Sequence, residues 1–327
     1  MKRRDFIGFF ASGAALSFAP RVASKPTPVI GYLHFSNPAD HIGSRPHAAF
    51  LDGLNDTGFF VDKNVAIVYG WADGKYEHSH ELVANLVGKN VDVIVAFGPP
   101  LARAAKEGTS TIPIVFEVGN DAVEAGLVTS LSHTGGNATG INVLFTQLTP
   151  KLLEIMAELI PQAKTFGLLV NPGSPTAEPN VRMAKEAASA GGVQLVALKA
   201  STPTEIDAAF AGASEAHVEA LIVGADPFLG NQRGQLTAQA ANHKMPMIYF
   251  TSGFTDDGGL ISYGANLPAV YRQMGVYVGR ILMGERPSDL PVEQPTKFEL
   301  SINLKTAKTL GLTVPASLLS RADEVIE

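Results

Sequence analysis

The chain of 327 residues contains no cysteine. This absence excludes disulfide bonds, thiolate catalysis, zinc–thiolate sites and a lipid anchor attached to cysteine. Charge is also sparse, since 17% of the residues are charged against 46% hydrophobic, and the formal net charge is −6. This negative balance, with no basic run beyond the first few residues, argues against a nucleic-acid partner. The length and the apolar content predict a globular protein of roughly two domains.

The first residues have the pattern of a secretory signal peptide. The basic residues KRR at positions 2–4 precede an apolar stretch at 6–19, and small residues lead up to Ser24. The apolar stretch is too short to span a bilayer, so we expect residues 1–24 to be removed near Ser24. The arginine pair resembles a twin-arginine signal, and the Sec and twin-arginine routes both stay open. We therefore expect a free, acidic protein in the periplasm.

Residue sets that would support catalysis or metal binding are missing from the sequence. His78 and His80 lie two positions apart on a predicted helix and therefore point in different directions. Ser174 lacks the GxSxG pattern of a nucleophile and is followed by proline. Asp256 and Asp257 lie in a glycine-rich turn. We expect no catalytic residue, metal ligand or cofactor, but an exported α/β enzyme remains an alternative because catalytic sets assemble in space.

An internal duplication is visible in the sequence. Segment 29–38 is similar to 165–172, 91–100 to 218–228, and 111–117 to 244–250. The three pairs occur in the same order in the two halves of the chain. The duplication predicts two domains built on one plan.

Strands and helices alternate within each half. Apolar runs such as 91–97 are typical of strands buried on both faces of a parallel sheet. Further strands are expected at 65–72 and 193–200, and helices at 44–59, 76–90, 148–161, 179–192 and 202–216. The last of these helices opens with a capping pattern, Thr202 and Glu205. The alternation predicts an α/β fold with parallel sheets and a cleft between the domains.

The turns that follow the predicted strands supply candidate ligand-binding residues, because ligands of open α/β sheets bind beyond the carboxyl ends of strands. The candidates are Phe35, Asn37, Gly98, Pro99, Pro100, Asn120, Asp121, Asn171, Ser174, Asp226, Phe228, Phe250 and Phe254. The aspartates could hold a ligand cation or cap a helix, and the aromatic rings could stack on a flat ligand or fill the core. Amides at the start of the helix after Pro100 could hold a carboxylate.

Several longer stretches resemble a known family. They include VIVAFGPP, IPIVFEVGNDAVEAGLVTSL, GGNATG, LLVNPGSP, LIVGADPF, GGLISYG and the run from 272 to 312. The chain resembles the solute-binding proteins of ABC importers with the type I periplasmic-binding fold, in the subfamily that includes tryptophan and tyrosine binders. The resemblance implies two Rossmann-like, doubly wound parallel-sheet domains joined by a three-segment hinge.

The resemblance also implies where the lobes divide. The expected N-terminal lobe comprises 25–145 and 252–293, and the C-terminal lobe comprises 146–251 and 294–327. The crossings are expected near 143–147, 250–254 and 291–296.

The function that the resemblance implies is binding of a small aromatic or amino-acid-like solute by a monomer, for delivery to an inner-membrane permease. Members of the family usually carry Ser or Thr at the position of Pro99, where the hydroxyl helps to hold an amino-acid carboxylate. The proline puts an α-amino-acid ligand in doubt. A protein that presents its ligand to a membrane receptor is a further alternative.

Overall fold

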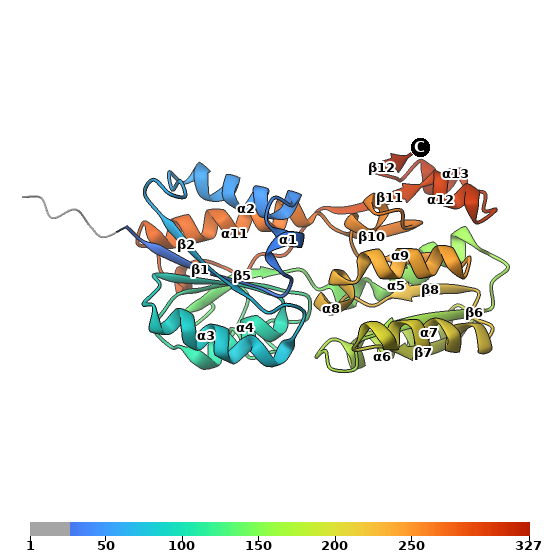
Figure 1. Cartoon of the computed structure of the whole chain (residues 1–327), viewed down its shortest axis with the longest axis horizontal. Coiled ribbons are helices and arrows are strands. Elements are labelled where there is room, and N and C mark those ends of the chain that lie inside the picture. Colours follow the sequence, from blue (N-terminus) through green and yellow to red (C-terminus); the bar gives the residue numbers. More distant parts are fainter. Residues whose placement is uncertain (1–26) are drawn as a thin grey trace, which may run out of the picture.

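The computed structural model describes residues 27–327, so the predicted signal peptide lies outside the described part of the chain. Two lobes lie side by side, each with its own sheet (Figure 1). The sheet of the first lobe is fully parallel, with the order β2-β1-β3-β4-β5. Its strands are β1 (Val29–His34), β2 (Ala66–Trp71), β3 (Val93–Phe97), β4 (Ile114–Val118) and β5 (Ala138–Asn142).

Helices cover both faces of the first sheet. Helices α2 (Arg45–Asp56) and α11 (Leu267–Leu282) pack together on one face, and α3 (Ser79–Gly88) and α4 (Pro99–Gly108) pack together on the other (Figure 1). Short helical segments lie at α1 (Pro38–His41), η1 (Tyr76–His78) and η3 (Pro287–Asp289). Every residue of β3, β4 and β5 is buried, as expected for strands covered on both faces.

The second lobe holds a sheet of seven strands in the order β12-β11-β10-β9-β8-β6-β7. Its strands are β6 (Thr165–Val170), β7 (Gln194–Lys199), β8 (Ala220–Val223), β9 (Met247–Tyr249), β10 (Ile261–Ala265), β11 (Phe298–Asn303) and β12 (Glu324–Ile326). All neighbours pair in parallel except β10 and β11. Its helical segments are η2 (Phe145–Leu148), α5 (Thr149–Leu159), α6 (Ala177–Ala190), α7 (Pro203–Glu215), α8 (Pro227–Asn231), α9 (Arg233–Asn242), α10 (Gly253–Asp256), α12 (Leu304–Thr309) and α13 (Ala316–Leu319).

The two sheets repeat one strand order, which confirms the predicted duplication. The order β2-β1-β3-β4-β5 of the first lobe recurs as β7-β6-β8-β9-β10 in the second. Strand β10 is therefore the fifth strand of the second unit and pairs with β9 as β5 pairs with β4. The predicted α/β fold of two parallel-dominated sheets is confirmed.

The position of β10 differs from the lobe boundary expected at residue 252. Residues 261–265 pair within the second sheet, so the chain crosses to the first lobe after Ala265 and not near 250–254. The short helix α10 lies between β9 and β10, so the sequence pattern does not continue directly from one strand to the next. The other two crossings lie between β5 and α5 and between Glu293, which still bridges to Ile141, and β11.

Local sequence signals explain several element ends. The Thr202 hydroxyl accepts a hydrogen bond from the Glu205 amide at 3.2 Å, so the expected capping residue begins α7. Gly98, the residue before α4, has a φ of +92°, a conformation that side chains with a Cβ rarely adopt. Among residues 27–327, no helix has the length and hydropathy that a membrane span requires.

Candidate binding cleft

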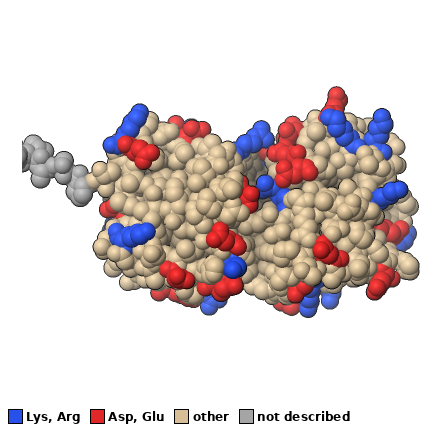
Figure 2. All heavy atoms as spheres, viewed as in Figure 1, with Lys and Arg blue, Asp and Glu red and all other residues tan. Residues whose placement is uncertain are grey.

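A cavity of about 610 Å³ lies between the lobes, at the carboxyl ends of their parallel strands. In the first lobe Phe35 follows β1 and Gly98 follows β3, and in the second lobe Asp226 follows β8 and Phe250 follows β9. Figure 2 shows a groove between the two halves of the molecule, with side chains of both charges near it. A cavity of this volume suits a small organic molecule.

Aromatic rings form part of the cavity wall. Phe97, at the end of β3, stacks on Tyr271 of α11 with the ring centroids 4.3 Å apart. Across the cavity, Phe145 and Phe250 make an edge-to-face contact at 5.6 Å. Rings arranged in this way offer flat apolar faces to a ligand.

Two neutral histidines lie beside these rings. The imidazoles of His34 and His41 stack 3.6 Å apart, and both line the cavity. Nε2 of His34 lies 3.1 Å from Oη of Tyr271, and Nε2 of His41 lies 2.7 Å from Oη of Tyr32. Burial lowers the pKa of both rings, that of His41 to about 3. Near neutral pH these histidines are hydrogen-bonding groups and not cations.

Asp226 is held by a network that joins the lobes. Its side chain begins α8 by accepting from the Leu229 amide at 3.1 Å, and it also accepts from Nδ2 of Asn171 at 3.2 Å. From the first lobe, the Tyr76 hydroxyl donates to the same carboxylate. Burial raises the pKa of Asp226, while these donors oppose the shift.

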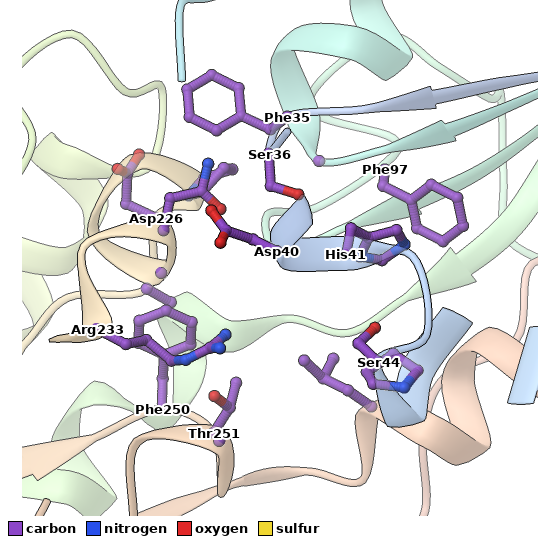
Figure 3. A pocket seen from close by; sticks show the side chains of 18 of the residues that line it. Phe35, Ser36, Asp40, His41, Ser44, Phe97, Asp226, Arg233, Phe250 and Thr251 are labelled. Atoms are coloured by element: carbon purple, nitrogen blue, oxygen red, sulfur yellow. The ribbon is translucent and has the colours of Figure 1, made fainter. Parts of the chain in front are cut away.

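Exposed ion pairs lie near the mouth of the cavity. Arg45 of α2 lies 3.6 Å from Asp256 of α10, so this pair spans the two lobes. Arg233 of α9 lies 3.0 Å from Asp257. Figure 3 shows Arg233 and Phe250 opposite Ser36, Asp40 and His41. Exposed pairs of this kind contribute little stability, so both arginines can turn toward a ligand.

Glu117 is the second buried acid of the cavity wall, after Asp226. It lies near the carboxyl end of β4, and 8% of its surface is exposed. Burial raises the pKa of this carboxyl to about 7, although the Gly98 amide opposes the shift. Within residues 27–327, no basic side chain lies within 4 Å of it and no side chain donates a hydrogen bond to it. A carboxylate in this state is open to a partner from outside the protein.

The structure brings five of the sequence-predicted residues to the cavity wall. They are Phe35, Gly98, Pro99, Asp226 and Phe250. The other eight do not line it. They are Asn37, Pro100, Asn120, Asp121, Asn171, Ser174, Phe228 and Phe254.

Nearby partners explain why several of the eight point elsewhere. Asn37 accepts from the Asp40 amide and begins α1, and Asp121 accepts from two following amides in the same way. Phe254 is fully buried against Tyr249. Ser174 is buried and its hydroxyl is hydrogen-bonded to that of Thr176.

Other residues of the cavity wall were not predicted from the sequence. Glu117, His34, His41 and Tyr271 all line the cavity. A glutamate within an otherwise apolar strand was the one usable signal, because a carboxylate in a buried strand needs an explanation. Tyr271 gave no such signal, since it lies on a helix far along the chain from the other residues.

A family profile and a sequence relative both indicate a protein that binds a small molecule. The profile of the family described as "ABC transporter substrate binding protein" matches residues 44–326. The chain is 27% identical over 263 residues to the tyrosine-binding protein of Clostridioides difficile (strain R20291), covering 80% of this chain and 75% of the relative.

Solved structures with the same architecture include two close matches. A conserved domain protein from Vibrio cholerae O1 biovar El Tor is 28% identical with a TM-score of 0.82, and the match covers 91% of this chain and 99% of that one. A Streptococcus pneumoniae ABC domain in complex with L-Trp is 24% identical with a TM-score of 0.79, over 91% of this chain and 100% of that one. Both share the two-lobed fold.

Proposed function

Because the chain belongs to the family of ABC transporter substrate-binding proteins, we propose that it binds a small solute between its lobes and delivers it to a membrane permease. The observation that carries this proposal is the cavity, to which both lobes contribute side chains at their strand ends. A ligand that contacts both lobes stabilises the closed arrangement over the open one. A permease can then distinguish the loaded protein from the empty one.

The solute that suits the cavity is aromatic or amino-acid-like. Phe97, Tyr271 and Phe250 offer flat apolar faces, and the relative from Clostridioides difficile is a tyrosine-binding protein. The start of α4 is a poor carboxylate site, because Pro99 and Pro100 have no amide hydrogen. An anionic group of the solute would instead face Arg233, whose present partner Asp257 is exposed.

The proposed location is the periplasm, where the protein acts as a free monomer and catalyses no reaction. Residues 1–24 would serve as the signal peptide, cleaved near Ser24 after export by the Sec or twin-arginine route. Replacing Arg3 and Arg4 by Lys distinguishes the routes. Retention of the precursor in the cytoplasm would indicate twin-arginine export, and normal processing would indicate Sec.

The test of binding is a thermal-shift screen of residues 25–327 with amino acids, aromatic acids, nucleosides and sugars, followed by calorimetry. An aromatic or amino-acid-like solute should raise the melting temperature. A rise with sugars alone would contradict the proposed solute class, and conversion of a bound solute by the pure protein would contradict the binding function. Uptake of the labelled solute, compared between cells with and without the gene, separates transport from sensing. Loss of a transport component should lower the uptake, whereas loss of a sensor should leave it unchanged.

A further inference from the structure

We propose that Glu117 is the counter-ion for a protonated amine of the solute, so that the cleft selects cations with a flat apolar body. This role presupposes the solute-binding function proposed above and narrows its substrate class. The position of the carboxylate, the engaged state of the other acids in the cavity and the aromatic rings around it support this role.

The fold places Glu117 at the wall of the cavity. In the sheet register it lies beside Phe97 of β3 and Ile141 of β5. Tyr271 of α11 packs on Phe97 and is close enough for Glu117 to affect the pKa of its hydroxyl. The carboxylate therefore lies deep in the cleft, next to the aromatic wall, and not at the solvent-exposed mouth.

The other acids of the cavity wall already have partners. Asp226 accepts from Tyr76, Asn171 and the Leu229 amide. Asp40 accepts from Nδ2 of Asn37 at 2.6 Å.

The acids at the mouth are also engaged. Asp256 and Asp257 lie beside Arg45 and Arg233. Within residues 27–327, Glu117 is the cavity-lining acid without a side-chain donor or a basic partner. This finding also replaces the expectation that an aspartate after a strand holds the ligand cation, because the carboxylates of Asp121 and Asp226 accept hydrogen bonds from other groups of the protein.

Burial without a counter-charge is costly for a carboxylate. The pKa of Glu117, raised to about 7, expresses this cost in the free protein. A protonated amine placed beside the carboxylate would supply the missing charge and donate up to three hydrogen bonds. The rings of Phe97 and Tyr271 leave an apolar surface for the rest of such a molecule.

Three compounds that share an indole ring test the charge requirement. L-Tryptophan and tryptamine carry a protonated amine, whereas indole-3-propionate lacks it. Calorimetry on residues 25–327 should show that both amines bind at least ~10-fold more tightly than the acid. The corresponding phenol series, L-tyrosine, tyramine and 3-(4-hydroxyphenyl)propionate, extends the comparison to a smaller ring.

The variant Glu117→Gln keeps the shape of the side chain and removes its charge. We expect it to weaken the binding of the amines by roughly 10- to 100-fold and to leave the binding of the deaminated acids unchanged or tighter. Glu81→Gln is the matched control, because Glu81 is exposed on α3 outside the cavity and its replacement changes the net charge by the same amount. The control should bind like the wild type.

Proton release gives a readout that a change in packing alone would not produce. A bound amine should push the pKa of Glu117 back down, so binding near pH 7 should release protons and affinity should rise from pH 6 to pH 8. Calorimetry in two buffers with different ionisation heats measures the protons released. Glu117→Gln should abolish this release.

Other titratable groups line the cavity together with Glu117. They are His34, His41, Tyr271, Asp40, Arg45, Asp226, Arg233, Asp256 and Asp257. Burial keeps the pKa of His34 and His41 well below neutral and that of Tyr271 well above it. These three groups therefore do not titrate near pH 7, where the proton release is measured.

Each outcome supports or overturns the role of Glu117. Selective loss of amine binding and of proton release in Glu117→Gln would support it. Equal binding of the amines and the acids, or unchanged amine binding by the variant, would overturn it while solute binding stands. If only uncharged or anionic solutes bind to the wild type, the role is also overturned. If no solute of the wider screen binds, the proposed function fails as well.

Discussion

The buried carboxyl of Glu117 gives the ligand-free protein a characteristic dependence of stability on pH. Its pKa is raised from 4.5 to about 7 in the folded state, so between these values the folded chain holds a proton that the unfolded chain has lost. The free energy of unfolding therefore falls as pH rises through this window, by on the order of 3 kcal/mol. The pKa of His41 is lowered from 6.5 to about 3, so between these values the unfolded chain holds a proton that the folded chain lacks. His41 therefore makes the free energy of unfolding rise with pH in that range.

A variant isolates this contribution. Glu117→Gln removes the carboxyl and leaves the histidines in place. The difference in free energy of unfolding between the variant and the wild type should grow from pH 5 to pH 8, in favour of the variant. Urea denaturation at several pH values measures this difference. A difference that stays constant with pH would show that the carboxyl titrates normally.

Tyr76 is the residue that connects the lobes through its hydroxyl. In Tyr76→Phe, Asp226 loses a hydrogen bond that exists only when the lobes are together. A hydrogen bond to a charged group contributes about 1.5–3 kcal/mol. A closed form that is less favourable by this amount should raise the Kd of a solute by about 10- to 100-fold, measured by calorimetry.

The control for this variant is Tyr263→Phe. The hydroxyl of Tyr263 on β10 makes no hydrogen bond among residues 27–327, and the residue does not line the cavity. Its Kd should match that of the wild type. Tyr76→Phe would contradict the role of the hydroxyl if its Kd also stayed unchanged.

At the scale of the elements, packing against α2 holds α11, and with it Tyr271, on one face of the first sheet. Glycines allow the two helices to approach closely. A Cβ on Gly53 would lie 1.9 Å from the carbonyl oxygen of Arg272, and one on Gly275 would lie 2.2 Å from that of Phe50. Since backbone atoms of the partner helix would be displaced, neither position has room for a side chain.

Gly53→Ala should therefore destabilise the fold despite the higher helix propensity of alanine. We expect a loss of about 1–3 kcal/mol or more in the free energy of unfolding, because α11 must shift. Gly88→Ala on α3 is the control. A Cβ there meets nothing within 4 Å, so its effect should be neutral or stabilising by up to about 1 kcal/mol. Chemical denaturation measures both, and equal effects would contradict the packing argument.

At the scale of the whole molecule, two lobes joined by three chain crossings form a hinged structure. The bond between Tyr76 and Asp226, the pair of Arg45 and Asp256, and the approach of Gly98 to Pro227 all link the lobes. The arrangement described here is thus a closed one. Short crossing segments can absorb the backbone rotation that opening requires.

Small-angle scattering tests this closure. Without solute, the radius of gyration should exceed the value calculated from residues 27–327 in this arrangement. Saturating solute should bring it down to that value, because a ligand held by both lobes favours the closed form. A radius that already equals the calculated value without solute, and does not change when solute is added, would indicate a rigid protein.

The sequence alone determined the elements and the plan of the fold. Apolar runs, turn residues and the cap at Thr202 act over a few neighbouring residues, so strands and helices followed from local patterns. The repeated segments also predicted two domains on one plan, and the strand order of the two sheets repeats accordingly. The fifth strand of the second unit was missed, because its membership depends on pairing with β9 and β11 and not on its own residues.

Tertiary structure alone decided which polar groups face the cavity. The side chains of Asn37 and Asp121 accept hydrogen bonds from amides two or three residues further along the chain, and these local bonds point them away from the cleft. Asp226 was engaged by Tyr76 from the other lobe. Glu117 has no side-chain donor or basic partner because of what the fold packs around it, including Tyr271, which lies far along the chain. A local pattern shows that a side chain needs a partner, but its partner is set by residues that only folding brings near.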